Sequence, residues 1–117
     1  MISREQADHF AQEWIEAWNR HDLDRILAHY SDDFTMASPR IALVAHEPSG
    51  VLQGKSEVGA YWARALALAP GLHFTLIGTF VGADSVAIHY QGPRGPAIEV
   101  FFLDPQGRAC RAAAHYA

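Results

Sequence analysis

The sequence predicts an α+β fold in which three N-terminal helices pack on one face of a curved, mainly antiparallel β-sheet. In the first half of the chain, aromatic and aliphatic residues recur at helical spacing. From Leu72 onward, apolar and polar residues instead alternate with a period of two. Short turns join the later segments, and short connections join antiparallel strands rather than parallel ones. Helices that precede such a meander gather on one of its faces, which gives the α+β arrangement.

Apolar faces and capping residues predict the three helices. Ser3 followed by Gln6 forms a capping box that starts the first helix near residue 4. Asp22 caps a short second helix, and Ser56 is the expected N-cap of a third helix that ends at Pro70. The apolar residues of these three helices are Phe10, Trp14 and Trp18; Leu23, Ile26, Leu27 and Tyr30; and Val58, Tyr61, Trp62, Ala65, Leu66 and Leu68.

The other regular segments are expected to be strands. Phe34–Ser38 alternates as a short first strand, which Pro39 ends or confines to the edge of the sheet. Residues 40–54 are expected to form a loop or an irregular hairpin. The long strands that complete the predicted sheet are 72–82, 84–92, the first part of 97–108, and 109–117.

Composition limits the class of protein. The chain has 117 residues, half of them hydrophobic, which suits one domain (residues 1–117) with a substantial core. A net charge of −4 without a basic stripe argues against nucleic acid as a partner. No apolar run is long enough to span a membrane, and the charged N-terminal segment lacks the apolar core of a signal peptide. Because the single cysteine, Cys110, cannot form an internal disulfide, a cytoplasmic location is expected.

Two segments connect this order of elements to a known group of proteins. "WIEAWNRHDLDRILAHYSDDFTMASP" and "GKSEVGAYWARAL" resemble the nuclear transport factor 2-like superfamily, and most of all its SnoaL-like and ketosteroid isomerase-like branch. The resemblance extends over residues 5–116. It implies a cone in which a strongly curved sheet wraps the first helix, with an apolar pocket between them for a small molecule. It also implies a homodimer through the outer face of the sheet.

The chemistry of the superfamily varies widely, since it includes isomerases, cyclases, dehydratases, epoxide hydrolases and domains without catalysis. Ketosteroid isomerases place an aspartate base before the proline of the first strand. A tyrosine on the first helix and a protonated acid on a later strand stabilise the developing oxyanion. The resemblance places Ser38 at the base position, Trp14 at the tyrosine position and Glu99 at the acid position.

Only one of these positions keeps its chemistry. An indole N–H donates a hydrogen bond but is less acidic than a phenol, and a serine without a partner cannot take a proton from carbon near neutral pH. Glu99 keeps the carboxyl, with one more methylene than an aspartate. Ketosteroid isomerisation by that mechanism is therefore not expected. Ser38 is either a hydrogen-bonding group of the pocket or a residue that satisfies a backbone group at the strand end.

Glu99 is the most informative of the candidate residues. It interrupts the apolar segment "PAIEVFF" and is expected to be buried on whichever face of the strand it lies. A buried carboxyl has a raised pKa unless it is paired with a cation. Glu99 is therefore either an acid or hydrogen-bond donor in the pocket, or a structural partner of Arg111 on the neighbouring strand.

Further residues are expected to line the pocket, each with a structural alternative. Aromatic residues on helix faces usually belong to the core. His46 is either a ligand contact at the pocket mouth or a solvated loop residue, and the small side chains of the last strand either leave room for a ligand or allow close packing. No metal or cofactor is expected, because no metal-binding spacing and no phosphate-binding loop are present. The expected lining residues are Trp18, Met36, His46, Trp62, Phe74, Ile88, Tyr90, Phe101, Ala112, Ala114 and Tyr116.

Two functions remain in competition. One is an enzyme of isomerase, cyclase or hydrolase type that acts on a small apolar molecule, with Glu99 as the acid and Ser38 and Trp14 assisting. The other is a non-catalytic, dimeric ligand-binding or accessory domain, which the absence of the usual tyrosine and aspartate favours. A protein-interaction module would need a large apolar outer face. The residues expected on that face suit only a modest dimer surface: Thr75, Ile77, Thr79, Ala87 and His89.

Overall fold

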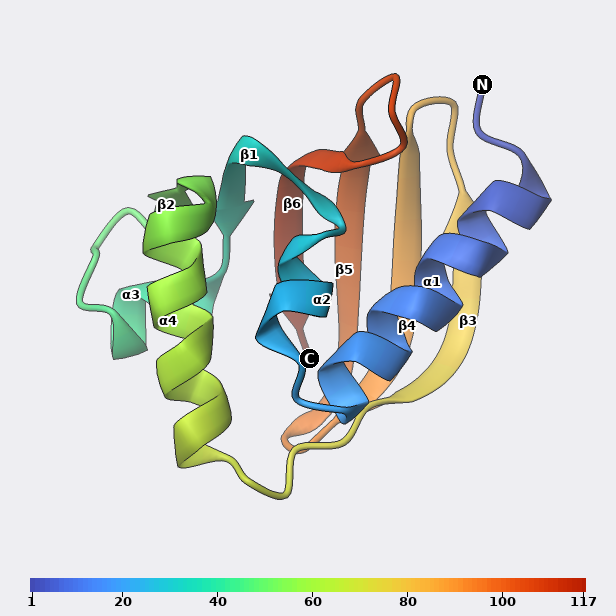
Figure 1. The fold of residues 1–117 in the computed structure, drawn as a ribbon. Coiled ribbons are helices and arrows are strands. Elements are labelled where there is room, and N and C mark those ends of the chain that lie inside the picture. The colour runs from blue at the N-terminus through green and yellow to red at the C-terminus, as the bar shows by residue number, and fades with distance from the viewer.

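The computed structural model describes all 117 residues and confirms the predicted α+β class. Figure 1 shows α1 and α2 lying across the same face of the sheet, with α4 beside its β1–β2 end. The elements in chain order are α1 (Arg4–Asn19), α2 (Leu23–Leu27), β1 (Tyr30–Ala37), α3 (Pro39–Val44), β2 (Val51–Gln53), α4 (Gly54–Leu68), β3 (Thr75–Val81), β4 (Ser85–Gly92), β5 (Gly95–Leu103) and β6 (Ala109–Tyr116).

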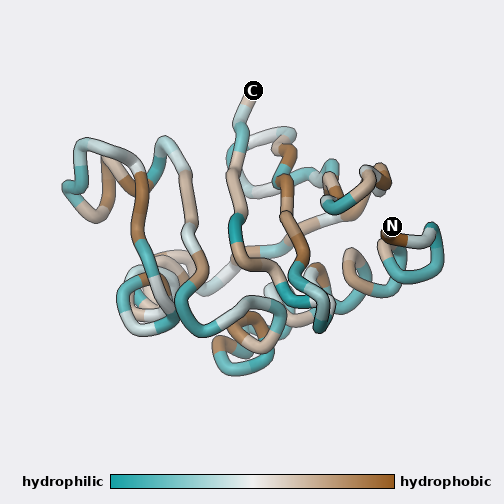
Figure 2. Tube along the Cα trace, turned by 90° about the horizontal axis from the view of Figure 1, so that it is seen from above, coloured by the Kyte–Doolittle hydropathy of each residue, from teal (hydrophilic) through white to brown (hydrophobic).

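The strands form one six-stranded sheet in the order β2-β1-β6-β5-β4-β3. Strands β3 to β6 make a continuous antiparallel meander, and β1 joins it by pairing parallel with β6. Seen from above, the main helices lie together on one side of the sheet, and hydrophobic residues recur along both helices and strands (Figure 2). The predicted curved and mainly antiparallel sheet is thus confirmed.

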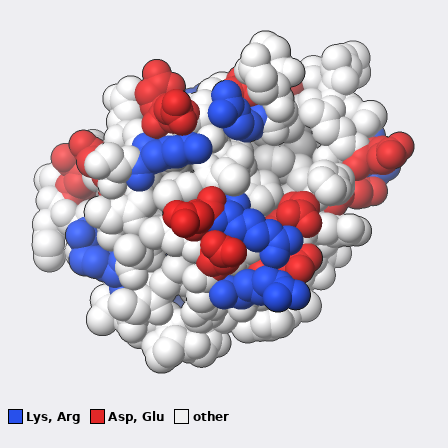
Figure 3. Space-filling view, viewed as in Figure 1, with Lys and Arg blue, Asp and Glu red and all other residues white.

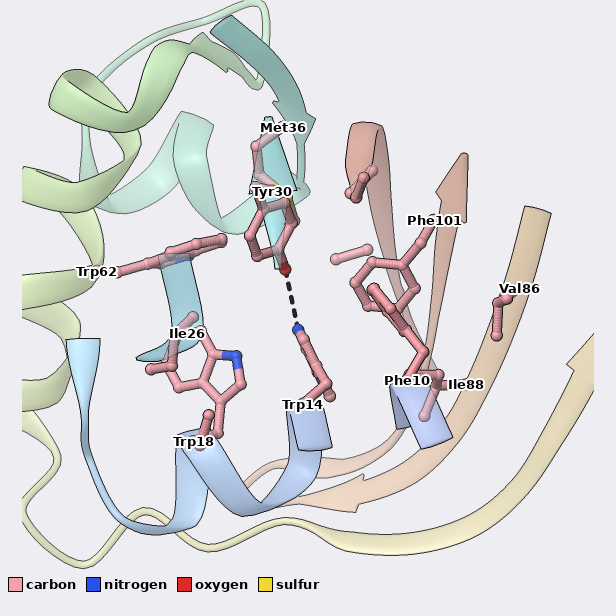
Figure 4. Close-up of a cluster of buried hydrophobic side chains, with 14 of the residues drawn as sticks. Phe10, Trp14, Trp18, Ile26, Tyr30, Met36, Trp62, Val86, Ile88 and Phe101 are labelled. Atoms are coloured by element: carbon pink, nitrogen blue, oxygen red, sulfur yellow. Dashed lines mark hydrogen bonds between the residues drawn. The ribbon is translucent and has the colours of Figure 1, made fainter. Parts of the chain in front are cut away.

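Aromatic side chains fill the space between α1 and the sheet. Trp14, Tyr30, Phe34 and Phe101 are the largest of the fully buried side chains. Phe10 packs edge-on against Phe101, with the ring centroids 5.0 Å apart. Figure 4 shows how rings from α1, β1 and β5 converge in this core. The apolar face predicted for the first helix is therefore the face that the helix buries.

Two predicted helix starts are confirmed by their capping bonds. The Ser3 side chain accepts a hydrogen bond from the backbone N–H of Gln6 at 3.0 Å and caps α1. The Asp22 carboxylate accepts one from the N–H of Arg25 at 3.1 Å and caps α2. Each bond satisfies an N–H that has no partner within its helix.

The structure adds a short fourth helix to the three predicted ones, because the segment expected to be a loop or an irregular hairpin contains two further elements. Ser38 is the N-cap of α3, and Pro39 occupies the first turn of that helix, where the missing N–H of proline is no loss. Strand β2 follows and pairs with β1. Helix α4 begins at Gly54 with Gln53 as its N-cap, so the predicted cap at Ser56 is also wrong.

The first strand is longer than predicted. It begins at Tyr30 instead of Phe34, and its pairing with β6 shifts register between Tyr30 and Thr35. The exposed carboxylates of Asp32 and Asp33 lie at this irregularity and interrupt the alternation that marks a strand. The sequence pattern therefore shows only the second half of β1.

The strand β3 starts at Thr75, later than the predicted Leu72, because the residues before it are bound to the end of α1. The Asn19 side chain donates to the carbonyl of Phe74 at 2.9 Å and accepts from its N–H at 2.7 Å. A ring nitrogen of His21 lies 2.8 Å from the carbonyl of Leu72. These backbone groups are thus satisfied by α1 and the turn after it, and not by strand pairing.

A bulge in β3 changes the face on which its later residues lie. The register with β4 shifts between Leu76 and Gly78, after which Thr79 pairs with the fully buried Ile88. Directly paired residues share a face, so Thr79 lies on the inner side of the sheet. The prediction that Thr79 belongs to the outer face is therefore wrong.

Charged side chains on the helical face form local ion pairs. Arg25 on α2 binds Glu13 at 3.0 Å and Glu16 at 3.5 Å, and Arg20 binds Glu16 at 3.1 Å. Figure 3 shows acidic and basic groups interleaved on this helical face. No helix is both long and apolar enough to cross a membrane.

Candidate ligand-binding site

A cavity of about 180 Å³ lies between α1, α4 and the sheet. Its lining comes from distant parts of the sequence: α1, the end of β1, α4, the segment before β3, the turn between β4 and β5, and the end of β6. Most of the lining residues are hydrophobic. The cavity is therefore a product of the tertiary fold, and no single sequence motif encloses it.

Aromatic rings that brace one another form one side of the cavity. Trp18 on α1 meets Trp62 on α4 edge to face, with the centroids 5.3 Å apart. Phe74 stacks on Trp14 at 5.6 Å and contacts Tyr90 at 4.6 Å. Such close packing leaves these side chains little rotational freedom, so they present a preformed apolar surface to a ligand.

Glu99 provides the cavity with a buried acid. It lies on β5 with 4% of its surface exposed, and the Tyr90 hydroxyl donates a hydrogen bond to its Oε1 at 3.1 Å. No other protein group donates to the carboxyl. Burial raises the pKa of Glu99 to about 7, although the bond from Tyr90 acts in the opposite direction. Near neutral pH the carboxyl therefore exists in both protonation states.

The alternative pairing of Glu99 with Arg111 is wrong. In the register of β5 and β6, Glu99 lies opposite Ala114, whereas Arg111 lies opposite Phe102. Arg111 is on the outer face of the sheet, where its guanidinium carbon lies 4.0 Å from the centroid of the Phe102 ring. Because the two charged groups point to opposite faces, Arg111 cannot neutralise Glu99, and no other cation forms a salt bridge with this carboxyl.

Ser38 has a structural role and also borders the cavity. Its hydroxyl oxygen accepts a hydrogen bond from the N–H of Arg40 at 3.2 Å and caps α3, so the backbone alternative is confirmed. Ser38 also lines the cavity next to Tyr116. Burial and the charge of Glu99 raise the pKa of Tyr116 to about 12, while the neighbouring Ser38 side chain acts in the opposite direction.

Trp14 lines the cavity but has no free donor to offer. Its indole N–H donates to the Tyr30 hydroxyl at 2.9 Å, and both side chains are almost completely buried (Figure 4). An indole has only this one polar hydrogen. Trp14 therefore contributes ring surface to the cavity and does not replace the oxyanion-binding tyrosine of ketosteroid isomerases.

Unlike Trp14, Trp18 has an indole N–H without a hydrogen-bond acceptor. Its indole nitrogen is the only buried side-chain nitrogen or oxygen in the protein without a hydrogen-bond partner. A buried donor without a partner destabilises the folded state by about 1–3 kcal/mol, and native proteins contain few of them. Because Trp18 also lines the cavity, its N–H is a candidate hydrogen-bond donor to a ligand.

The structure brings most of the predicted site residues to one cavity and leaves the others outside it. His46 is exposed in the loop after α3. Ile88 and Phe101 are fully buried under the N-terminal half of α1, where Phe10 packs on Phe101. Ala112 and Ala114 are buried on the inner face but do not line the cavity, and Ala112 lies opposite Phe101 in the register. The predicted residues that do line the cavity are Trp14, Trp18, Met36, Ser38, Trp62, Phe74, Tyr90, Glu99 and Tyr116.

Several lining residues were not predicted. Tyr61 precedes Trp62 on α4, and the apolar spacing of that helix contained the signal for it. Arg40 and Arg94 carry no sequence signal, because the first follows a helix cap and the second lies in the turn between β4 and β5. No group of three or more His, Cys, Asp or Glu side chains is placed to hold a metal ion.

Comparison with known protein families finds a match over most of the chain. A family model described as the SnoaL-like domain matches residues 11–116. The chain belongs to the SnoaL-like domain family. Among curated proteins, none matches this SnoaL-like sequence.

Solved structures of similar proteins agree with the family and the fold of this SnoaL-like protein. A SnoaL-like protein of unknown function from Burkholderia thailandensis is 56% identical, with a TM-score of 0.97 over 99% of this chain and 98% of that chain. A nuclear transport factor 2-like protein of unknown function from Burkholderia pseudomallei is 17% identical, with a TM-score of 0.76 over 99% and 92% of the two chains. A protein of ketosteroid isomerase-like fold from Catenulispora acidiphila, in complex with trimethylamine, is 17% identical, with a TM-score of 0.72 over 92% and 85%.

Proposed function

We propose that the cavity binds a small, largely apolar molecule and that Glu99 is its acid–base group, as in an isomerase, a cyclase or a hydrolase. The observation that carries this proposal is the buried Glu99 carboxyl, which borders the cavity and has one hydrogen bond and no salt bridge. A solved protein of this fold is in complex with a small organic molecule, trimethylamine, which is compatible with such a role.

The pKa of Glu99 suits proton transfer. A group whose pKa lies near the working pH can both give and accept a proton, and burial raises the pKa of Glu99 to about 7. The Tyr90 hydroxyl holds Oε1, which leaves Oε2 to reach the ligand. When the carboxylic acid gives its proton to a basic atom of the ligand, the negative charge remains on the carboxylate, where the bond from Tyr90 stabilises it.

A non-catalytic binding protein is the second candidate. It is favoured because the polar groups expected to assist Glu99 are already engaged in hydrogen bonds within the protein. The Ser38 hydroxyl caps α3, and the Trp14 N–H is bound to Tyr30. Glu99 is the only carboxyl that borders the cavity, so no second carboxyl completes an acid–base pair. Reversible binding without turnover needs no such pair.

Exchange of carbon-bound protons separates the two candidates without knowledge of the natural substrate. A small ketone such as 2-cyclohexenone is incubated in D₂O with the protein, and loss of its α-proton signals is followed by NMR. We expect exchange above the buffer rate for the wild type and the buffer rate for Glu99→Gln, with Asp33→Asn as the surface control. If wild type and Glu99→Gln exchange at the same rate, Glu99 performs no proton transfer and the binding role remains.

We also propose that two copies of the chain associate through the outer face of the sheet. One aligned row of apolar side chains crosses all six strands on this face, in positions that pair directly between neighbours. Its ends are exposed, with Phe80 60% and Val51 38% accessible, and Ile98 beside the row is 43% accessible. An exposed apolar surface of this kind is typical of an association site. The row consists of Phe80, Ala87, Val100, Ala113, Ala37 and Val51.

A further inference from the structure

The cations of this protein divide into those with an acidic partner and those without. Arg111, on the outer face, is without one and lies over Phe102. The others without a partner are Arg40, Arg64 and Arg94. Arg40 and Arg94 line the cavity itself, and the positive charges of Arg40 and Arg64 act on the Tyr61 hydroxyl. The cations that bind a carboxylate are Arg4, Arg20, Arg25, Lys55 and Arg108.

Local charge at the cavity therefore has the opposite sign to the charge of the whole protein, which is −4. Two guanidinium groups border the cavity, and the only carboxyl there is the buried Glu99. Arg94 is exposed and Arg40 is partly exposed, so both lie toward the solvent side of the cavity. Guanidinium groups bind carboxylates with two parallel hydrogen bonds, and they attract anions from solution.

The volume of the cavity limits the apolar part of a ligand. A dry cavity of about 150 Å³ holds a benzene-sized guest, and the cavity here measures about 180 Å³. Trp18, Trp62 and Phe74 give it flat aromatic walls. A single ring, or an aliphatic group of that size, matches this space.

We infer that the ligand of this cavity is a small carboxylate or similar anion, with an apolar body of about one ring among the aromatic walls and its charge beside Arg40 and Arg94. This inference rests on the proposed function, in which the cavity binds a small molecule. The unpartnered N–H of Trp18 offers a further hydrogen bond to an acceptor atom on the ligand body.

A protonated amine is the opposite ligand class, since aromatic walls and a carboxyl also attract cations. Such a ligand would have to approach past Arg40 and Arg94, which repel it. Its partner would be Glu99, whose pKa of about 7 means that much of the carboxyl is uncharged at neutral pH. The charges at the mouth therefore favour the anion.

The experiment uses three probes of one shape and different charge: phenylacetate, phenylacetamide and phenethylamine. All the tryptophans, Trp14, Trp18 and Trp62, line the cavity, so quenching of intrinsic fluorescence reports binding directly. We expect the wild type to bind phenylacetate about tenfold more tightly than phenylacetamide, and phenethylamine most weakly. The advantage of phenylacetate over phenylacetamide should fall as salt is added.

Substitution of Arg40 and Arg94 then tests whether the carboxylate of the ligand lies beside these two residues. Arg40→Gln with Arg94→Gln should bring phenylacetate to the affinity of phenylacetamide, which itself should be unchanged. Arg111→Gln is the matched control, because it removes an unpaired arginine from the outer face. If the amide binds as tightly as the carboxylate, or the amine binds best, the inference is overturned and the proposed binding function remains. If none of the probes binds, the proposed binding function is overturned as well.

Discussion

Replacing Glu99 with glutamine should stabilise the protein at high pH and change its stability little at low pH. Glutamine has nearly the same shape as glutamate and can still accept the hydrogen bond that Tyr90 donates to Oε1. It cannot ionise, so the substitution removes the charge and keeps the packing. The difference in stability between the two proteins therefore measures the free-energy cost of burying an acid that can ionise.

The magnitude follows from the pKa of Glu99, which burial raises from 4.5 to about 7. Between these two values the folded state keeps a proton that the unfolded chain has released, so the free energy of unfolding falls as the pH rises. The stabilising contribution of this proton is complete below the pKa of the unfolded chain and is lost as the pH passes through the folded pKa. The full difference is roughly 3 kcal/mol, at about 1.4 kcal/mol for each pH unit.

Urea unfolding of wild type and Glu99→Gln measures this difference at two pH values, about 5 and about 8. We expect the variant to be more stable than the wild type by roughly 3 kcal/mol at the higher pH and by less than about 1 kcal/mol at the lower pH. Asp33→Asn removes an exposed carboxylate and should show no such dependence. A variant that is less stable at both pH values, or a difference that does not change with pH, would refute the reasoning.

Three further substitutions test the packing around the site. Tyr30→Phe leaves the buried N–H of Trp14 without an acceptor and should lower the free energy of unfolding, measured in urea, by about 1–3 kcal/mol. The double variant with Trp14→Phe should lose less stability than the sum of the two single variants. Full additivity would show that the hydrogen bond between Trp14 and Tyr30 does not contribute to stability. Ser38→Ala removes the N-cap of α3 and should cost about 1 kcal/mol by the same assay, whereas an unchanged stability would show that the cap contributes nothing. Val100→Glu places a charge in the middle of the outer apolar row and should convert a dimer to a monomer in light scattering after gel filtration; a wild type that is already a monomer would contradict the proposed interface.

Helix faces and strand alternation were visible in the sequence because each depends on a local period. The first helix follows the spacing of Phe10, Trp14 and Trp18, and its cap follows from Ser3 and Gln6. The burial of Glu99 follows from the apolar residues on both sides of it in the strand. These features need only the chain near each residue, and the structure confirms them.

Features that depend on contacts between distant segments were not visible. The donor of Trp14 is used by Tyr30, which the helical spacing had assigned to the second helix and which instead starts β1. Arg94 reaches the cavity only because the turn between β4 and β5 closes over it. The pairing register of β5 and β6, which separates Glu99 from Arg111, is likewise set by the whole sheet.

The most direct test of the account is a titration of the Glu99 carboxyl itself. Carbon-13 NMR of protein labelled at glutamate side-chain carboxyls, compared with Glu99→Gln to assign the signal, gives the pKa of this group. We expect a midpoint of about 7, because burial raises the pKa and no cation opposes it. A midpoint near the ordinary 4.5 would show that the carboxyl is solvated or paired, and Glu99 would then not be the near-neutral acid on which the proposed chemistry depends.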